Sequence, residues 1–201
     1  MGLFGQQQQQ VDEYSDLRSR FHSELSKIEK TKNLLRDDGG RPLLLFHGSK
    51  TTTAFKKFGS PKDNGALRTW FSTSLDYASG YAEGIGKVHV CVASIPTDNT
   101  RDFIDLTSTG IDCASPLPQD EFEIEDLAYD MSFACGCSPE ELVQPLVDSD
   151  SLMDLIQNSE FPGFSSECVA YLESVNGDSV ALGFLNPGTH VKIVGAVSPN
   201  E

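Results

Sequence analysis

Three short apolar runs in the last part of the chain constrain its fold most strongly. They cover Cys168–Leu172, Val180–Leu185 and Val191–Val194, and each has the length and the apolar content of a strand. Asn176-Gly177, a strong hairpin turn signal, separates the first two runs. Asn186-Pro187-Gly188 marks a second turn. Because tight turns join antiparallel strands while parallel pairs need a long crossover, these runs predict a mostly antiparallel sheet.

Three further strands are predicted in the first half of the chain. Leu43–Phe46 is a continuous apolar run typical of a buried strand, and Thr69–Ser72 is a short run with two aromatic residues. Lys87–Ile95 alternates valine with other residues, as strands do. Leu75–Glu83 is predicted to form a helix with Ser74 as its N-cap. Together these segments indicate the α+β class.

The N-terminal segment has the periodicity of an amphipathic helix. Apolar residues recur at steps of three and four, and charged residues fill the other faces. Gly39-Gly40 and Pro42 end the pattern, so a helix is predicted over residues 11–37, within a segment that spans 11–40. It could dock on the domain or pair with a partner helix, and docking is favoured. The stripe comprises Val11, Tyr14, Leu17, Phe21, Leu25 and Ile28.

An acidic stretch over residues 98–160 is predicted to be a helical insertion between strands. It holds 16 acidic residues and one basic residue. A helix is predicted over Asp120–Phe133, closed by Gly136, and another over Ser151–Gln157. Between them, Ser138-Pro139 followed by two glutamates is a favourable helix start, and Pro145 is expected to limit that helix.

The domain organisation follows from these segments. Residues 1–10 form a Gln-rich lead that is predicted to be disordered, and they lack the basic and apolar regions of a signal peptide. The N-terminal helix occupies 11–40. One domain then spans 41–197 and contains the acidic insertion.

Charge is distributed unevenly along the chain. The net charge is −15, made of +4 in residues 1–68 (12 basic and eight acidic) and −19 in residues 69–201 (three basic and 22 acidic). This balance argues against general binding to a nucleic-acid backbone and against approach to an anionic membrane. No apolar run reaches the 18 residues that a membrane-spanning helix needs. The acidic part is either an electrostatic contact face or a solvated surface, which is the simpler interpretation.

The five cysteines predict reduced thiols. They are odd in number and scattered along the chain, so a cytoplasmic location is expected. For a phage factor or an effector, this would be the cytoplasm of a host cell. Cys135-Gly-Cys137 has no second cysteine pair and no histidine at ligand spacing beside it. No metal site is therefore expected.

Three residues stand where a ligand could meet the predicted sheet. His47 follows the first buried strand, and Gly48 beside it would let a ligand approach the backbone. Trp70 lies on the second strand and Tyr81 near the end of the following helix. If that strand and helix flank a cleft, the two rings could enclose a flat aromatic ligand. Taken singly, each residue is more often structural than functional.

The combination resembles a known family. Phe46-His47-Gly48-Ser49, with the stretch from Trp70 to Ala82, resembles the NAD-binding half of ADP-ribosyltransferases. The similarity is to the branch with a His-Tyr-acid triad, which includes poly-ADP-ribose polymerase-like and diphtheria-toxin-like enzymes. It covers residues 43–95 and, loosely, the last forty. Trp70 stands where the family has the triad tyrosine, and Ala78 where many members have serine. The resemblance implies an ADP-ribosyltransferase-like fold with a split, mostly antiparallel sheet.

The resemblance also implies roles for individual residues. His47 would bond to a ribose hydroxyl of NAD, Gly48 would hold the carboxamide, and Trp70 and Tyr81 would enclose the nicotinamide ring. A carboxylate would stabilise the positive charge that develops on the ribose. The catalytic set so implied is His47, Trp70 and Glu173, with Asp178 and then Glu167 as alternatives for the acid. The implied NAD-binding set is His47, Gly48, Ser49, Trp70, Phe71, Ser72 and Tyr81.

The implied function is that of a mono-ADP-ribosyltransferase. Such an enzyme transfers ADP-ribose from NAD to a macromolecular acceptor, here expected to be a protein, and releases nicotinamide. The basic loop from Lys50 to Arg68 is a candidate contact for NAD phosphates or for an acidic target. A toxin, an effector or a phage factor would fit the small size. Two alternatives stay open: a catalytically degenerate binding or inhibitor protein that uses its acidic surface, and an NAD glycohydrolase with water as acceptor.

Overall fold

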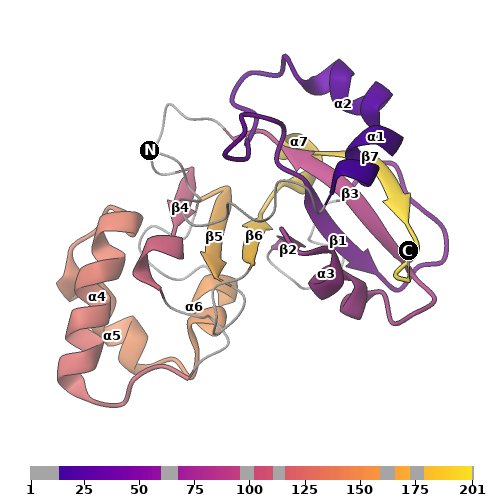
Figure 1. Cartoon of the computed structure of the whole chain (residues 1–201). Helices are drawn as coiled ribbons and strands as arrows, with labels where there is room; N and C mark the ends of the chain where they lie inside the picture. Colours follow the sequence, from indigo (N-terminus) through magenta and orange to yellow (C-terminus); the bar gives the residue numbers. More distant parts are fainter. Residues whose placement is uncertain are drawn as a thin grey trace. The chain divides into compact units, whose positions relative to one another are not determined.

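The chain folds into a mixed α/β structure with mostly antiparallel strand pairing, as the sequence predicts. The computed structural model describes residues 14–59, 68–95, 102–110, 116–158, 166–172 and 179–200 (Figure 1). Two compact units are present. Unit 1 comprises Met1–Phe58, Phe71–Ile95 and Gly188–Glu201, and unit 2 comprises Gly59–Trp70 and Pro96–Pro187.

Unit 1 contains an antiparallel sheet. Strand β1 (Leu45–Ser49) pairs with β3 (Lys87–Ala93) along its whole length, and β3 pairs with β7 (Val191–Val197). The end of β2 (Thr69–Ser72) lies on the other side of β1. These segments confirm the predicted strands. The valines of β3 at positions 88, 90 and 92 are buried in one core with Phe46, because alternate strand residues face the same side.

The N-terminal segment docks on unit 1, as predicted, but it is not one helix over 11–37. Helix α1 (Ser15–Arg20) and helix α2 (His22–Ile28) are separated by Phe21, whose ring occupies the space where a Cβ on Gly195 of β7 would lie. Beyond Ile28 the apolar stripe stops, and Leu34 bridges to Ser94 instead. The docking residues Tyr14, Leu25 and Ile28 are buried in the same core as Phe46.

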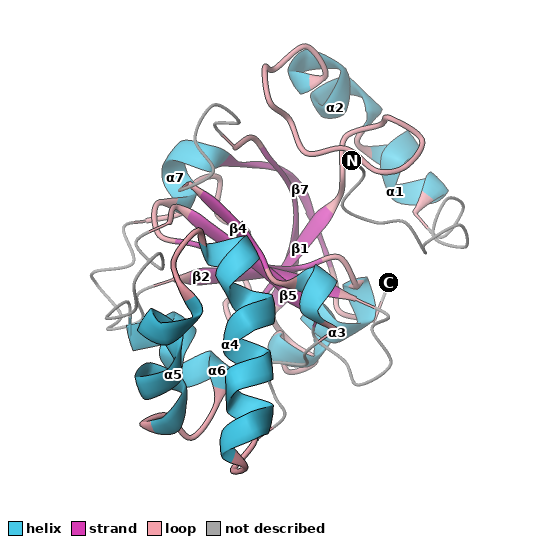
Figure 2. Ribbon diagram, turned by 90° about the vertical axis from the view of Figure 1, so that its left-hand side faces the viewer, coloured by secondary structure: helices cyan, strands magenta, loops and turns pink. Residues whose placement is uncertain are grey.

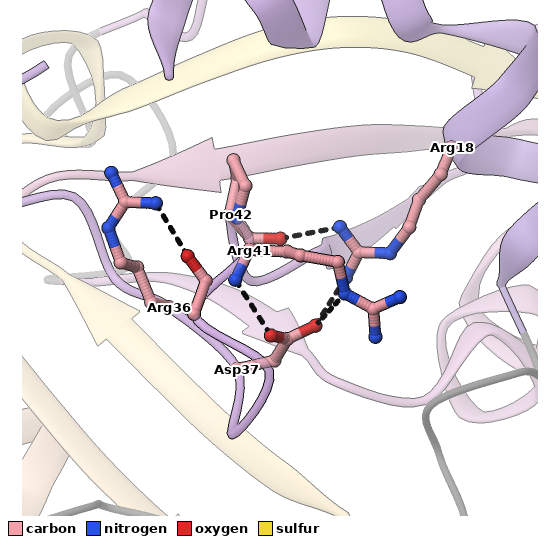
Figure 3. A network of polar contacts seen from close by, with 6 residues as sticks. Arg18, Arg36, Asp37, Arg41 and Pro42 are labelled. Atoms are coloured by element: carbon pink, nitrogen blue, oxygen red, sulfur yellow. Dashed lines mark hydrogen bonds and ion pairs between the residues drawn. The ribbon is translucent and has the colours of Figure 1, made fainter. Parts of the chain in front are cut away.

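A polar network holds α1 to the segment that follows the helices (Figure 3). The Asp37 carboxylate accepts hydrogen bonds from Arg18 Nη2 at 3.0 Å and from Arg41 Nε at 3.1 Å. Arg18 Nη1 also donates to the carbonyl oxygen of Pro42 at 2.8 Å. Burial lowers the pKa of Arg18, and the charge of Asp37 opposes that shift. The interactions replace the water that these half-buried charges lose.

Helix α3 (Leu75–Tyr81) begins at the predicted cap. Ser74 Oγ accepts a hydrogen bond from the Tyr77 amide at 3.1 Å, which satisfies one of the free amides of the first turn. Ala78 and Ala82, two small residues on one face of the helix, are buried against the sheet. Gly84, with φ of 73°, lies in the turn that follows the helix.

Unit 2 contains a second group of strands. Strands β5 (Cys168–Leu172) and β6 (Val180–Phe184) pair antiparallel, as predicted, whereas their expected turn at Asn176-Gly177 lies outside the described residues. Strand β4 (Phe103–Asp105) pairs parallel with β5. The acidic insertion is therefore not purely helical. The order is β4-β5-β6-β2, and the first two residues of β2 belong to this unit.

The helices of unit 2 follow the sequence signals closely. Helix α4 (Glu121–Cys135) is capped by Asp120 and ends at Gly136, with φ of 65°. Helix α5 (Pro139–Val147) starts with a capping box and runs two residues past Pro145. Both views show α4 beside α5, with α6 (Leu152–Asn158) close by (Figure 2).

Two short helices were not predicted. A single 3-10 turn, η2, covers Thr107–Thr109, and the expected turn at Asn186-Pro187-Gly188 runs into a one-turn helix, α7 (Pro187–His190). None of the described helices combines the length and the apolar character needed to cross a membrane.

A buried arginine organises unit 2. Arg68, directly before β2, is 2% exposed. Its guanidinium donates to the carbonyl oxygens of Ile156 at 3.4 Å, Ser166 at 2.9 Å and Gly183 at 3.3 Å. These oxygens belong to the end of α6, to the entry of β5 and to β6. Burial lowers the pKa of Arg68 to about 10, so that the side chain still carries its charge at neutral pH.

Candidate functional site

His47 lies among aromatic rings on one face of the unit 1 sheet. Its ring centroid is 5.2 Å from that of Phe58 and 5.4 Å from that of Phe71. His89, directly opposite on β3, is 6.2 Å away. The side chain is only half-buried. His47 therefore has a hydrophobic backing on several sides and keeps a solvent-accessible part.

His89 is a buried neighbour that sequence reasoning missed. It is fully buried, and its Nε2 accepts a hydrogen bond from the Phe55 amide at 3.2 Å. Burial, reinforced by the nearby His47, lowers the pKa of His89 to about 4, although the backbone of His47 favours the charged form slightly. The ring is therefore neutral at pH 7, and the acceptor role of Nε2 assigns its proton to Nδ1. Nδ1 has no partner with hydrogen-bond geometry.

His89 holds the segment after β1 on the sheet. The ring of Phe55 lies 3.8 Å from that of His89, at an interplanar angle of 30°. Phe58 in turn contacts Phe55 and Phe71 edge to face, at 5.1 Å and 5.0 Å. The segment that follows the His47-Gly48-Ser49 motif is thus anchored by one hydrogen bond and by stacked rings.

The structure brings Gly48 and Tyr81, two residues of the implied NAD-binding set, close together. A Cβ on Gly48 would collide with the carbonyl oxygen of Ala78 and would lie 2.9 Å from Tyr81 Cβ. Helix α3 can therefore approach β1 closely only because position 48 is glycine. Tyr81 is 59% exposed, and its hydroxyl lies 3.2 Å from that of Tyr77 one turn earlier. The result is a pair of exposed phenol rings on α3, and one of them belongs to the residue that packs against Gly48.

The edge of β1 separates from β2 at this motif. In the described part of the chain, Phe46 opposite Ser72 is the one register position between β1 and β2. On its other edge, β1 continues to pair with β3 from Leu45 to Ser49. Strand pairing therefore leaves the β2-side edge of Gly48 open. Such an edge can offer amide and carbonyl groups to a ligand.

The other predicted binding residues have structural partners. Trp70 packs within unit 2, where its ring lies 5.3 Å from that of Tyr171 and covers Gly183. Phe71 is buried beside His47, and Ser72 Oγ accepts the Ser74 amide at 2.9 Å. Since successive strand residues face opposite sides, Phe71 and not Trp70 lies on the His47 side of β2. The stacking of Trp70 with Tyr81 stays a prediction.

Ser49 and the candidate acids complete the predicted set. Ser49 Oγ lies 2.9 Å from Thr51 Oγ1, so it contributes to the turn after β1. Glu173 and Asp178 lie outside the described residues. The Glu167 carboxylate accepts hydrogen bonds from Asn186 Nδ2 at 2.8 and 2.9 Å, which is a structural role in unit 2. Glu173 therefore stays the predicted acid.

The cysteines in the described part of the chain show no sign of activation. The four within the described residues are free thiols. Burial raises the pKa of Cys135 to about 12 and also raises that of Cys137, so neither favours the thiolate that zinc binds. Across the described ranges, no group of three or more histidine, cysteine, aspartate or glutamate side chains could hold a metal ion.

Comparison with known proteins gives no independent assignment. No family model matches the chain, and neither a curated protein nor a solved structure matches it. The ADP-ribosyltransferase-like fold therefore stays a prediction.

Proposed function

We propose that this protein is a mono-ADP-ribosyltransferase that uses NAD as its substrate and a protein as its acceptor. The observation that carries the proposal is the contact between the open edge of β1 at Gly48 and the exposed Tyr81 on α3. An aromatic carboxamide such as nicotinamide needs both features, namely backbone groups for its amide and an aromatic face for its ring. Packing explains the glycine at position 48, but it does not explain two exposed tyrosines beside it.

The chemistry assigned to the site is a displacement at the nicotinamide ribose. The bond between C1′ of the ribose and the ring nitrogen breaks, and its electron pair leaves with nicotinamide, which neutralises the cationic ring. His47 bonds a ribose hydroxyl, and the predicted acid, Glu173, stabilises the positive charge that develops on the ribose. A nucleophile of the acceptor then forms the new bond to C1′ and gives up its proton.

The environment of His47 suits a role in orientation. Phe58 and Phe71 fix the ring from two sides. A rotamer that packing holds loses less entropy when it bonds to a ligand. Trp70 is assigned to this function by the resemblance alone.

Labelling with biotinylated NAD tests the proposal. Purified protein is incubated with bacterial and eukaryotic lysates beside His47→Ala, Tyr81→Ala and Glu173→Gln. The expected result is labelled protein bands that all three variants lose. Tyr129→Ala, which removes an exposed tyrosine of α4, is the matched control for NAD-dependent thermal stabilisation, and it should respond to NAD as the unmodified protein does.

The outcomes separate the three functions. Nicotinamide release without labelled protein would identify an NAD glycohydrolase. A ligand at 100 times its Kd stabilises a fold by about 2.7 kcal/mol. If NAD gives no stabilisation, no label and no nicotinamide, the chain is a binding protein and the proposal is wrong.

A further inference from the structure

Helix α4 exposes three large aromatic side chains on one face. Phe122, Tyr129 and Phe133, together called the α4 stripe, are 76%, 56% and 73% exposed. Their spacing of seven and four residues places them in one row along the helix. The opposite face of α4 packs in the core of unit 2 through Ile124, Leu127 and Met131. The α4 stripe therefore plays no part in that core.

The rings of the α4 stripe are already arranged for contact. Tyr129 and Phe133 meet edge to face, with centroids 5.1 Å apart and an interplanar angle of 87°. Single exposed apolar residues are ordinary, but a row of three aromatic residues on one helix face is typical of an interaction surface. Helices that bind a groove present anchors at this kind of spacing.

Acidic side chains surround the α4 stripe. The helix carries Glu121, Glu123, Glu125, Asp126 and Asp130, all exposed, and no basic residue. By helical geometry, Asp126 lies within the row, while Glu125 and Asp130 lie on its two sides. This surface would repel nucleic acid, an anionic membrane and the same helix of a second copy. A positively charged partner would be attracted.

We propose that the α4 stripe docks into a groove of a basic partner protein, whose apolar floor receives the aromatic rings and whose lysine and arginine rim meets the flanking acids. The surface belongs to unit 2, so the inference does not rest on the proposed transferase activity. The rings supply the buried area, and the acids supply orientation and rapid association.

A synthetic peptide tests the chemistry of this surface. The probe is a fluorescein-labelled amphipathic helix made of leucine and lysine, and a peptide of the same composition in scrambled order is its control. Anisotropy should show binding of the amphipathic probe that weakens with added salt. The double variant Phe122→Ala/Phe133→Ala should bind about tenfold more weakly, because interface aromatic residues contribute most of the affinity.

Ile85→Ala is the matched protein control. Ile85 is also 76% exposed, but it lies in unit 1 and is not part of α4. This variant should bind the probe as the unmodified protein does. The charge variant Asp126→Asn/Asp130→Asn should lose part of the affinity and part of the salt dependence. Circular dichroism confirms that each variant remains folded.

Four results would overturn the proposal. They are no binding of the amphipathic probe, equal binding of the scrambled peptide, equal binding by the Phe122→Ala/Phe133→Ala variant, and a concentration-dependent dimer that this variant abolishes. The last result, measured by sedimentation, would make a second copy of the chain the occupant of the surface.

Discussion

Arg68 in unit 2 and His89 in unit 1 are both buried basic side chains, and they differ in whether they carry a charge at neutral pH. Arg68 of unit 2 is 2% exposed and His89 of unit 1 is 0% exposed. Burial lowers both pKa values, to about 10 for Arg68 and to about 4 for His89. Arg68 therefore stays charged at neutral pH, and His89 does not.

The difference lies in the groups that face each side chain. Arg68 donates to three carbonyl oxygens, which replace the water around its charge. His89 faces the rings of Phe55 and His47 and accepts one hydrogen bond, and the favourable effect of the His47 backbone on the charged form is smaller than the cost of burial. Unit 2 uses a charged arginine to connect its segments, whereas the buried histidine of unit 1, behind the candidate site, is neutral.

Arg68→Met should have the largest effect on stability. The substitution keeps much of the volume but leaves three carbonyl oxygens without their donor, and each such group costs about 1–3 kcal/mol when buried. We expect a loss of about 4 kcal/mol in the free energy of unfolding, measured by urea titration. Arg41→Met, at an arginine whose side chain is 39% exposed, is the control and should cost under about 1 kcal/mol. Similar losses in both variants would contradict the role given to Arg68.

Acidification should weaken the fold through His89. The pKa of His89 is about 4 in the folded protein, against 6.5 for an ordinary histidine. Between these values the unfolded chain binds a proton and the folded chain does not, so stability falls as pH falls from about 6.5 to about 4. The total loss in the free energy of unfolding from this group is about 3 kcal/mol. His89 causes no further change in stability at pH values above or below this window.

His89→Gln isolates this contribution. Glutamine can still accept the Phe55 amide, but it does not titrate. Urea titrations at several pH values should show a smaller loss of stability on acidification in the variant than in the unmodified protein. Identical pH profiles would mean that His89 is already protonated in the folded state.

The effect of His47 on this titration should be smaller. The charge of His47 is the second cause, after burial, of the lowered pKa of His89. His47→Gln should therefore raise the pKa of His89, so that the acid-linked loss of stability becomes smaller and is complete at a higher pH. An NMR titration of the ring protons of His89 measures the shift. A lower pKa in the variant would show that His47 favours the protonated form instead.

The sequence predicts what depends on neighbouring residues. The strand of Lys87–Ala93 follows from its alternating valines, and the starts of α3 and α4 follow from Ser74 and Asp120, because a cap acts within one helical turn. The resemblance placed Gly48 and Tyr81 in one implied NAD-binding set, and the structure brings the two residues together, whereas their binding of NAD stays a prediction.

What the sequence did not predict depends on distant contacts. Strand β4 has three residues, too few for a periodic pattern, and it exists through pairing with Cys168–Ala170. The helix expected to reach residue 37 ends at Ile28, because the backbone of Leu34 forms an antiparallel β-bridge with Ser94 and so cannot be helical. The burial of His89 was not predicted, because no residue within its strand indicates that Phe55 contacts it. The acid predicted at Glu173 lies outside the described residues.

Among these substitutions, Phe133→Ala on the exposed face of α4 should have the smallest effect on stability. Phe133 is 73% exposed, so Phe133→Ala removes little buried surface and replaces an aromatic residue with a better helix former. We expect the free energy of unfolding to change by no more than about 0.5 kcal/mol in the urea titration. Met131→Ala, two residues earlier on the buried face of the same helix, is the control and should cost about 2–5 kcal/mol.

Phe133→Ala and Met131→Ala compare an exposed and a buried apolar side chain of one helix, as Arg68 and His89 compare two buried basic side chains. If Phe133→Ala costs as much as Met131→Ala, the ring stabilises the fold and the α4 stripe is no longer a free surface. If it costs nothing, folding does not account for an aromatic residue at position 133. The ring is then available for contact with another molecule, as proposed for the α4 stripe, and the leucine–lysine peptide tests that contact directly.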